Sequence, residues 1–411
     1  MKSFLLFTLA LASRLLAQTY DFAAVTAQFQ ANLDVYGGRV IAIVEQDGTG
    51  EIFRFQAGTI TQDTKYGIAS CSKWLSGAIV LACAERGLFH LDDRVGDTLP
   101  IFDTYGKGGV TIRQCFAMTS GLSLRNPDYE TDRTLTLAES VDLIAANTPV
   151  IFPPGTQFDY EGDAMQTIGR ICEVVTGQNW NALAREQLFD PLGMSGADYF
   201  FFGTNPGIAG GARCSAADYL KFLRMVLHNG QGENGRVILS SRSVQEFFTN
   251  QTFGLPEYYS PVQDSDYYAY GQRPDYGMGS WIEAQNPATG VVEEAASPGA
   301  FGTYPWVDRR RGLRGIIYMF GNGHAAIENN LHVIALIRAE IDAKGLPPPG
   351  APGPVSTSLA DKYLRLAWSG GGTLETSPDF TAWTVVPWAS SPFLESLAHP
   401  PGRKFFYRVR R

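Results

Sequence analysis

Ser70 and Lys73 form the pair whose residue types and spacing point to chemistry. A short extended segment, 65–69, runs into a long apolar stretch, so Ser70 is expected at a helix N-terminus. There the unpaired backbone N–H groups and the positive end of the helix dipole can face a developing oxyanion. Lys73 lies three positions further on, one turn along the same helix face, which predicts its amine beside the Ser70 hydroxyl. The pattern indicates nucleophilic catalysis by Ser70 with Lys73 as proton partner; the alternative is an N-cap serine followed by an ordinary surface lysine.

The elements that must position this pair can be predicted around it. Apolar residues recur at helical spacing over 72–86, and Gly87 follows as a helix end. Upstream, an amphipathic helix over 22–33 precedes two alternating strands, 39–45 and 51–57.

A helix-rich region follows, and strands return late in the chain. The expected helices span 137–146, 164–175, 180–188 and 216–228. The expected late strands span 276–283, 302–308 and 312–320, and a helix over 331–343 closes the unit. Strands from both ends with helices between them predict an α/β (α+β) fold. It would have one antiparallel sheet flanked by helices, a helical subdomain beside it, and the site between the two.

The C-terminal region predicts a separate small unit. Residues 346–355 are rich in proline and read as a stiff linker. Beyond it, 356–411 carries strand patterns at 364–368, 372–376, 381–387 and 405–409, which predict a small all-β accessory module. The sequence does not indicate a partner for this module.

Composition and the N-terminus narrow the class of protein. The chain has 411 residues, of which 45% are hydrophobic and 18% charged, and a net charge of -8, which is typical of a globular protein and does not favour nucleic-acid binding. Residues 1–17 resemble a cleavable signal peptide, which predicts a secreted or periplasmic protein, and no later stretch is long and apolar enough for a membrane span. The five cysteines and five histidines have no ligand spacing, so neither a metal site nor another cofactor is predicted.

Four longer blocks around these elements resemble a known family: the class C serine β-lactamases, the related D,D-peptidases and the esterases that share their fold. The blocks are "YGIASCSKWLSGAIVLACAERGLFHLDDRV", "VTIRQCFAMTSGL", "FPPGTQFDYEGDAMQTIGRICEVVTG" and "LFDPLGM", in the family's order. The resemblance implies a β-lactamase/transpeptidase-like domain over 19–345. It also implies that Ser70 and Lys73 are the family's nucleophile and its lysine.

The family's second element, Tyr-x-Asn, is matched by Tyr160-Glu161-Gly162. The resemblance implies that Tyr160 carries the proton from Ser70 to the leaving group with the help of Lys73. Gly162 departs from the pattern, since the family's asparagine helps to orient the substrate amide. Asp163 or Gln166 could fill part of that place, but neither is assigned a catalytic role.

The third element, Lys/His-Thr-Gly, is best matched by Ser297-Pro298-Gly299. Gly299 would allow close approach of the substrate, and the N–H of Ala300 would join that of Ser70 as an oxyanion donor. Ser297 stands where the family's lysine helps to hold the substrate carboxylate, and it carries no charge. Tyr304 and Trp306, shortly after this element, either line an acyl pocket or belong to the core.

These residues predict a secreted serine hydrolase, most simply a carboxylesterase that acts through an acyl-enzyme on Ser70. Its substrate would be a small-molecule ester or amide. One alternative is β-lactamase or D,D-peptidase activity, with another cation in place of Ser297. The second alternative is a catalytically silent ligand-binding sensor of the same fold. A conventional lipase is disfavoured because no Gly-x-Ser-x-Gly sequence occurs.

Overall fold

The computed structural model describes most of the chain. It covers residues 19–126, 128–271, 274–345, 355–360, 362–368, 372–378, 380–386, 389–396 and 406–410. The predicted signal peptide, 1–17, and residues 346–354 of the predicted linker lie outside the described residues.

A seven-stranded sheet is built from both ends of the main domain, as the sequence predicts. The strand order is β2-β1-β11-β10-β9-β8-β7, and every neighbouring pair is antiparallel. The strands are β1 (Val40–Gln46), β2 (Gly50–Ala57), β7 (Asp275–Tyr276), β8 (Trp281–Gln285), β9 (Val292–Ala296), β10 (Tyr304–Asp308) and β11 (Leu313–Tyr318). Because β1 pairs with β11, the N-terminal hairpin completes a sheet made by the chain's late strands.

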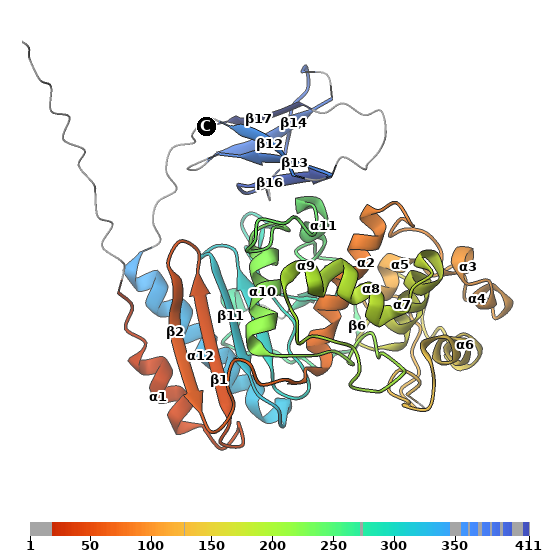
Figure 1. The fold of residues 1–411 in the computed structure, drawn as a ribbon, viewed down its shortest axis with the longest axis horizontal. Helices are drawn as coiled ribbons and strands as arrows, with labels where there is room; N and C mark the ends of the chain where they lie inside the picture. Colours follow the sequence, from red (N-terminus) through yellow and green to blue (C-terminus); the bar gives the residue numbers. More distant parts are fainter. Residues whose placement is uncertain are drawn as a thin grey trace, which may run out of the picture.

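Helices cover both faces of this sheet (Figure 1). Along β1, Val40, Ala42 and Val44 face one apolar core, while Ile41 and Ile43 face the other, as expected from the two-residue repeat of a strand. The first core is closed by α1 (Ala23–Ala31) and α12 (Gly323–Lys344). The second is closed by α2 (Ser72–Glu85) and α10 (Ala216–Leu227).

The helical subdomain packs against α2. Its helices are α3 (Val95–Thr98), α4 (Ile101–Thr104), α5 (Ile112–Phe116), α6 (Leu137–Asn147), α7 (Asp163–Thr176), α8 (Trp180–Ala184), the π-helix η2 (Arg185–Phe189), α9 (Asp190–Leu192) and α11 (Ser241–Glu246). The remaining elements of the main domain are short: β3 (Tyr66–Gly67), η1 (Ala69–Cys71), β4 (Phe158–Asp159), β5 (Arg213–Cys214), β6 (Glu257–Tyr259) and η3 (Ala269–Gly271). Among the described helices, none is both long and apolar enough to cross a membrane.

Three sequence predictions for the main domain were wrong in detail. The strand expected over 276–283 is two strands, β7 and β8, because the chain turns through Gly279 at a positive φ of 82°. The strand β9 was missed. The last helix begins at Gly323, eight residues before the predicted start, where the Asn322 side chain accepts from the N–H of Ala325 and caps it.

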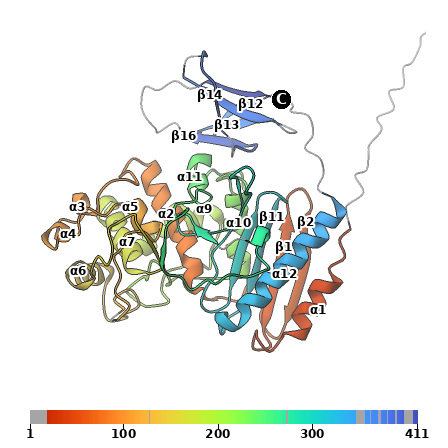
Figure 2. The ribbon, with the colours of Figure 1, turned by 180° about the vertical axis from the view of Figure 1, so that it is seen from behind.

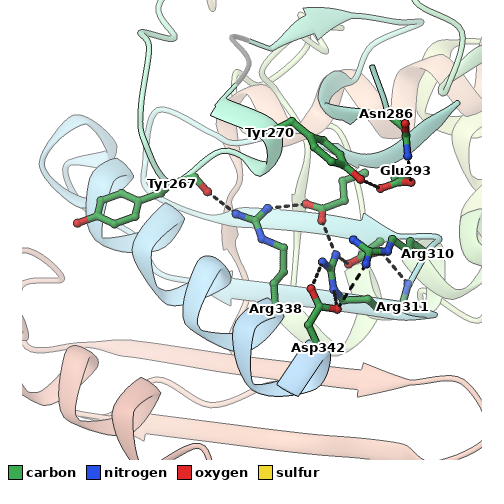
Figure 3. Close-up of polar contacts among 10 residues, drawn as sticks. Tyr267, Tyr270, Asn286, Glu293, Arg310, Arg311, Arg338 and Asp342 are labelled. Carbon is green, nitrogen blue, oxygen red and sulfur yellow. Dashed lines mark hydrogen bonds and ion pairs between the residues drawn. The ribbon is translucent and has the colours of Figure 1, made fainter. Parts of the chain in front are cut away.

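A buried ionic network, here called the arginine network, ties α12 to the end of the β10–β11 hairpin (Figure 3). The guanidinium of Arg311 donates to Asp308 at 2.7 Å, to Glu294 at 3.0 Å, and to both oxygens of Asp342 at 2.9 and 2.7 Å. Arg338 of α12 donates to the other oxygen of Glu294 at 2.7 Å. Each arginine of the network therefore faces at least one carboxylate directly.

The C-terminal module consists of two three-stranded sheets. One contains β12 (Ser356–Ala360), β13 (Tyr363–Ala367) and β16 (Phe393–Ser396), and the other β14 (Thr373–Ser377), β15 (Thr384–Val385) and β17 (Phe406–Arg410). The all-β character agrees with the prediction, although β12 and β16 were not foreseen.

The module contacts the main domain beside α11 (Figure 2). The Tyr363 hydroxyl donates to Glu85 at 2.6 Å, and the N–H of Leu394 donates to the Ser241 hydroxyl at 2.8 Å. These contacts join the module to the last residue of α2 and to the first residue of α11.

Candidate active site

The nucleophile candidate Ser70 lies in a tight turn immediately before α2. Ala69 has a positive φ of 45°, an unusual conformation for a residue with a side chain. The Ser72 hydroxyl donates to the carbonyl of Ala69 at 2.6 Å and accepts from the N–H of Ala212 at 3.0 Å. The turn is therefore held from the first residue of α2 and from the 205–212 loop, which fixes the direction of the Ser70 side chain.

Lys73 lies beside Ser70, as the spacing predicts. Its side chain is buried, with 5% of the residue exposed. The ammonium nitrogen lies 3.2 Å from Ser70 Oγ and 3.0 Å from the carbonyl oxygen of Ala209, to which it donates. It also lies 4.7 Å from the centre of the Tyr160 ring. Lys73 thus joins the two other residues of the predicted constellation.

Tyr160 reaches this point from the helical subdomain. It follows β4, which pairs with β6, and its N–H donates to the carbonyl of Tyr259 at 3.0 Å. Its ring stacks on Trp281 of β8 with centres 5.1 Å apart. Subdomain and sheet therefore meet at Tyr160, and Ser70, Lys73 and Tyr160 are brought together.

Two backbone N–H groups are placed to receive an oxyanion. Among the described residues, no acceptor takes a hydrogen bond from the N–H of Ser70 or of Ala300, and both residues line the same pocket. Gly299 makes this approach possible, because a Cβ at that position would lie 2.3 Å from the carbonyl oxygen of Ile68. The chain after β9 therefore packs directly against the turn that carries Ser70.

Ser297 has a different setting from the one that its place in the motif implies. It is buried, with 2% exposed, and its hydroxyl donates to the carbonyl of Ser70 at 3.0 Å. It is not among the described residues that line the pocket. The contact places Ser297 behind the nucleophile, where it holds the backbone of Ser70.

The pocket around Ser70 has a volume of about 140 Å³. Its described lining residues are Ser70, Tyr160, Pro261, Val262, Trp281, Pro298, Gly299, Ala300, Gly323, His324 and Ile327. None of these is a lysine or an arginine. Trp281 supplies the aromatic wall, whereas Tyr304 and Trp306 are buried in the core behind the sheet. Tyr304 bonds to Glu283 there, so the core interpretation of these two aromatics holds.

The place of the missing asparagine is occupied by a residue that the sequence patterns did not single out. Asp163 bonds to Thr148, and Gln166 bonds to Asn205, so neither fills it. Instead, a Cβ at Gly162 would lie 1.7 Å from a carboxylate oxygen of Glu130. Glu130 lies in the loop before α6, outside every motif, and only the spatial approach identifies it.

No cluster of three or more histidine, cysteine, aspartate or glutamate side chains in the described part of the chain is arranged to hold a metal ion. All five cysteines are buried and unpaired.

Comparison with known proteins places this geometry in a family. The model of the Beta-lactamase family matches residues 25–337. The chain belongs to the β-lactamase family. Penicillin-binding protein 4 of Amycolatopsis lactamdurans is 26% identical over 377 residues, which are 80% of this chain and 93% of that protein.

Solved structures agree with this assignment. A β-lactamase-like protein from Bacteroides dorei DSM 17855 is 30% identical, with a TM-score of 0.70, over 79% of this chain and 100% of that one. EstCE1, a hydrolase with promiscuous acyltransferase activity, shares the fold at 15% identity and a TM-score of 0.61, over 76% of this chain and 97% of that one. The β-lactamase/transpeptidase-like fold predicted from the sequence is confirmed, and the protein is a serine hydrolase of that fold.

Proposed function

We propose that this protein is an exported carboxylesterase that acts through an acyl-enzyme on Ser70. The observation that carries the proposal is the uncharged pocket: among its described lining residues there is no lysine or arginine to hold a substrate carboxylate. β-Lactams and peptidoglycan stems both bear such a carboxylate, and a charge-assisted hydrogen bond to it would contribute about 1.5–3 kcal/mol. A simple ester does not need that contact.

The proposed reaction has two steps. Ser70 Oγ attacks the ester carbonyl. Its proton passes to Tyr160 and from there to the leaving alcohol, and Lys73 assists this proton transfer. The N–H groups of Ser70 and Ala300 would bind the oxyanion of the tetrahedral intermediate. Water then releases the acyl group from Ser70. The pocket is smaller than the roughly 300–1,000 Å³ of drug-sized sites, which favours a short acyl chain.

A substrate comparison tests the proposal. We expect kcat/KM for p-nitrophenyl butyrate to exceed that for nitrocefin by about a hundredfold or more, which corresponds to about 2.7 kcal/mol of transition-state discrimination. Ser70→Ala should abolish ester hydrolysis and labelling by a fluorophosphonate, while Ser358→Ala, an exposed serine of the C-terminal module, should change neither.

Other outcomes would assign the protein differently. Comparable turnover of nitrocefin would indicate a β-lactamase or D,D-peptidase, the activity to which the similarity to penicillin-binding protein 4 points. Binding of ligands without turnover or labelling would indicate a sensor. Full activity in Ser70→Ala would contradict the acyl-enzyme altogether.

A further inference from the structure

Glu130 and Gly162 share one space in the active site. A side chain at 162 would begin 1.7 Å from Glu130 Oε2, so any residue larger than glycine would have to displace the carboxylate from its present position. In the Tyr-x-Asn pattern of the family, Gly162 stands at the position of the asparagine. Glycine at position 162 therefore leaves room for Glu130, whose carboxylate lies where the amide side chain of the family's asparagine would lie.

Glu130 is connected to Lys73 through the backbone of one residue. Glu130 Oε1 accepts from the N–H of Ala209 at 2.9 Å, and Lys73 donates to the carbonyl of the same Ala209 at 3.0 Å. In the described part of the chain, the Lys73 nitrogen donates to Ser70 Oγ and to the Ala209 carbonyl and forms no ion pair with a carboxylate. Burial raises the pKa of Glu130, and the charge of Lys73 opposes this rise. A buried ammonium requires such a counter-charge.

The charge of Glu130 depends on pH in the neutral range. Burial raises its pKa to about 7, against the opposing effects of Lys73 on α2 and the N–H groups of Ala209 and Gly210. Asp128 of the same loop also raises it. Asp163 at the start of α7 is the further acidic group that interacts with it.

We propose that Glu130 is a positioning residue of this active site: its carboxylate occupies the volume of the absent asparagine side chain and, when ionised, binds the N–H of Ala209 more firmly, so that the Ala209 carbonyl holds Lys73 toward Ser70 and Tyr160. Lys73 in this position, 3.2 Å from Ser70 Oγ and over the Tyr160 ring, would stabilise the Tyr160 oxygen while that oxygen takes the proton of Ser70. The proposal rests on Ser70 being the nucleophile, but not on which ester is the substrate.

Fluorophosphonate labelling of the purified full chain tests this without a substrate. In this step a bond forms between Ser70 Oγ and phosphorus, the P–F bond breaks, and Tyr160 takes the serine proton as it gives its own hydroxyl proton to the departing fluoride. Below pH 7 Glu130 is neutral, and above it the carboxylate is charged, so the labelling rate of the wild type should rise through about pH 7. Glu130→Gln should lack this rise and react about tenfold more slowly at pH 8.5, whereas Glu130→Asp should retain the rise.

Asp163→Asn is the matched control, because it removes a neighbouring buried carboxyl that bonds to Thr148 and lies on α7. It should leave the rise near pH 7 in place. A Glu130→Gln profile identical to that of the wild type would overturn the proposal. If the wild type labels with the expected profile but hydrolyses no ester, the proposed function fails and the role of Glu130 stands.

A volume exchange tests the shared space and covers the case in which Glu130→Gln does not fold. Gly162→Asn alone should lower the melting temperature markedly, because its side chain meets the Glu130 carboxylate. The double variant Glu130→Ala/Gly162→Asn should recover most of that loss, since the space is then free. If Gly162→Asn is as stable as the wild type, or if the second substitution restores nothing, the two residues do not share the space and the proposal is wrong.

Discussion

The arginine network and the active site both bury charge, but they compensate it in opposite ways. In the arginine network every arginine lies within hydrogen-bond distance of a carboxylate. These contacts shift the pKa of Arg311 and that of its partner Asp342. Burial alone would lower the pKa of Arg311. The hydrogen bonds to Asp342 and the charges of Asp308 and Glu294 outweigh this effect, so the pKa of Arg311 is raised. Arg311 in turn lowers the pKa of Asp342. Asp308 departs from this pattern, because burial and the neighbouring Glu294 raise its pKa to about 7.

In the active site the carboxyl groups lack such direct partners. Burial raises the pKa of Asp163 to about 7 and that of Glu161 well above its usual value, and the charge of Asp163 adds to the rise at Glu161. Their hydrogen bonds come from Thr148 and from backbone N–H groups, and none comes from a cation. The comparison teaches that direct contacts between cations and carboxylates tie the first cluster together, whereas the carboxyl groups of the second are buried without a cation bonded to them.

The largest difference should appear on removing the cation of the active site. Lys73→Met should lower kcat/KM for p-nitrophenyl butyrate by about 10²–10⁴-fold, because the proton of Ser70 loses its charged neighbour. The free energy of unfolding should fall by less than about 1 kcal/mol or rise, because a buried, incompletely compensated charge disappears. Steady-state kinetics and urea denaturation measure the two effects. A large loss of stability together with activity would mean that Lys73 belongs to a structural network like that of Arg311.

The converse is expected for the arginine network. Arg311→Met should lower the free energy of unfolding by about 3–5 kcal/mol, since three carboxylates lose their common partner. Arg310→Met is the matched control: its side chain is 40% exposed and 3.9 Å from Asp342, so its loss should cost at most about 1 kcal/mol. Denaturant unfolding of both variants measures the difference, and kcat of the folded enzyme should stay unchanged. Equal costs for the two arginines would contradict the comparison.

A smaller effect should appear in the pH dependence of stability. The pKa of Asp163 is raised on folding, so its contribution is fully present below its unfolded pKa near 4 and is lost as pH rises through about 7. Asp163→Asn should therefore unfold like the wild type near pH 3.5 and be more stable at pH 8, by at most about 4 kcal/mol. Melting curves across this range test the sign. A variant that is less stable at pH 8 would show that the ionised carboxylate is stabilising.

The sequence predicts most of what local patterns can encode. Ser70 and Lys73 lie within one helical turn, so their proximity follows from spacing alone. The sheet follows from alternation in 39–45 and 51–57 and from late strands. Tyr160 lies ninety positions from Ser70, and only the family resemblance connected the two.

The features that the sequence did not predict depend on contacts between segments that are far apart along the chain. No sequence motif around Glu130 identifies it as an active-site residue, because its proposed role depends on the approach of its loop to Gly162. The sequence shows that Gly162 departs from the family pattern, but it does not show why. The reason appears only in the structure, where Glu130 fills the space of the absent side chain. Ser297 shows the same limit, since its motif position indicated substrate contact and its hydroxyl contacts the Ser70 backbone.

Helix α2 gives the molecule two functionally distinct ends. Ser70 stands two residues before its first residue, Ser72, and Glu85, its last residue, accepts a hydrogen bond from the hydroxyl of Tyr363 of the C-terminal module. Fourteen residues of helix separate these ends by about 21 Å at 1.5 Å per residue. A protein attached to a solid support or a fibre through its module would thus be mounted at one end of this helix and react at the other.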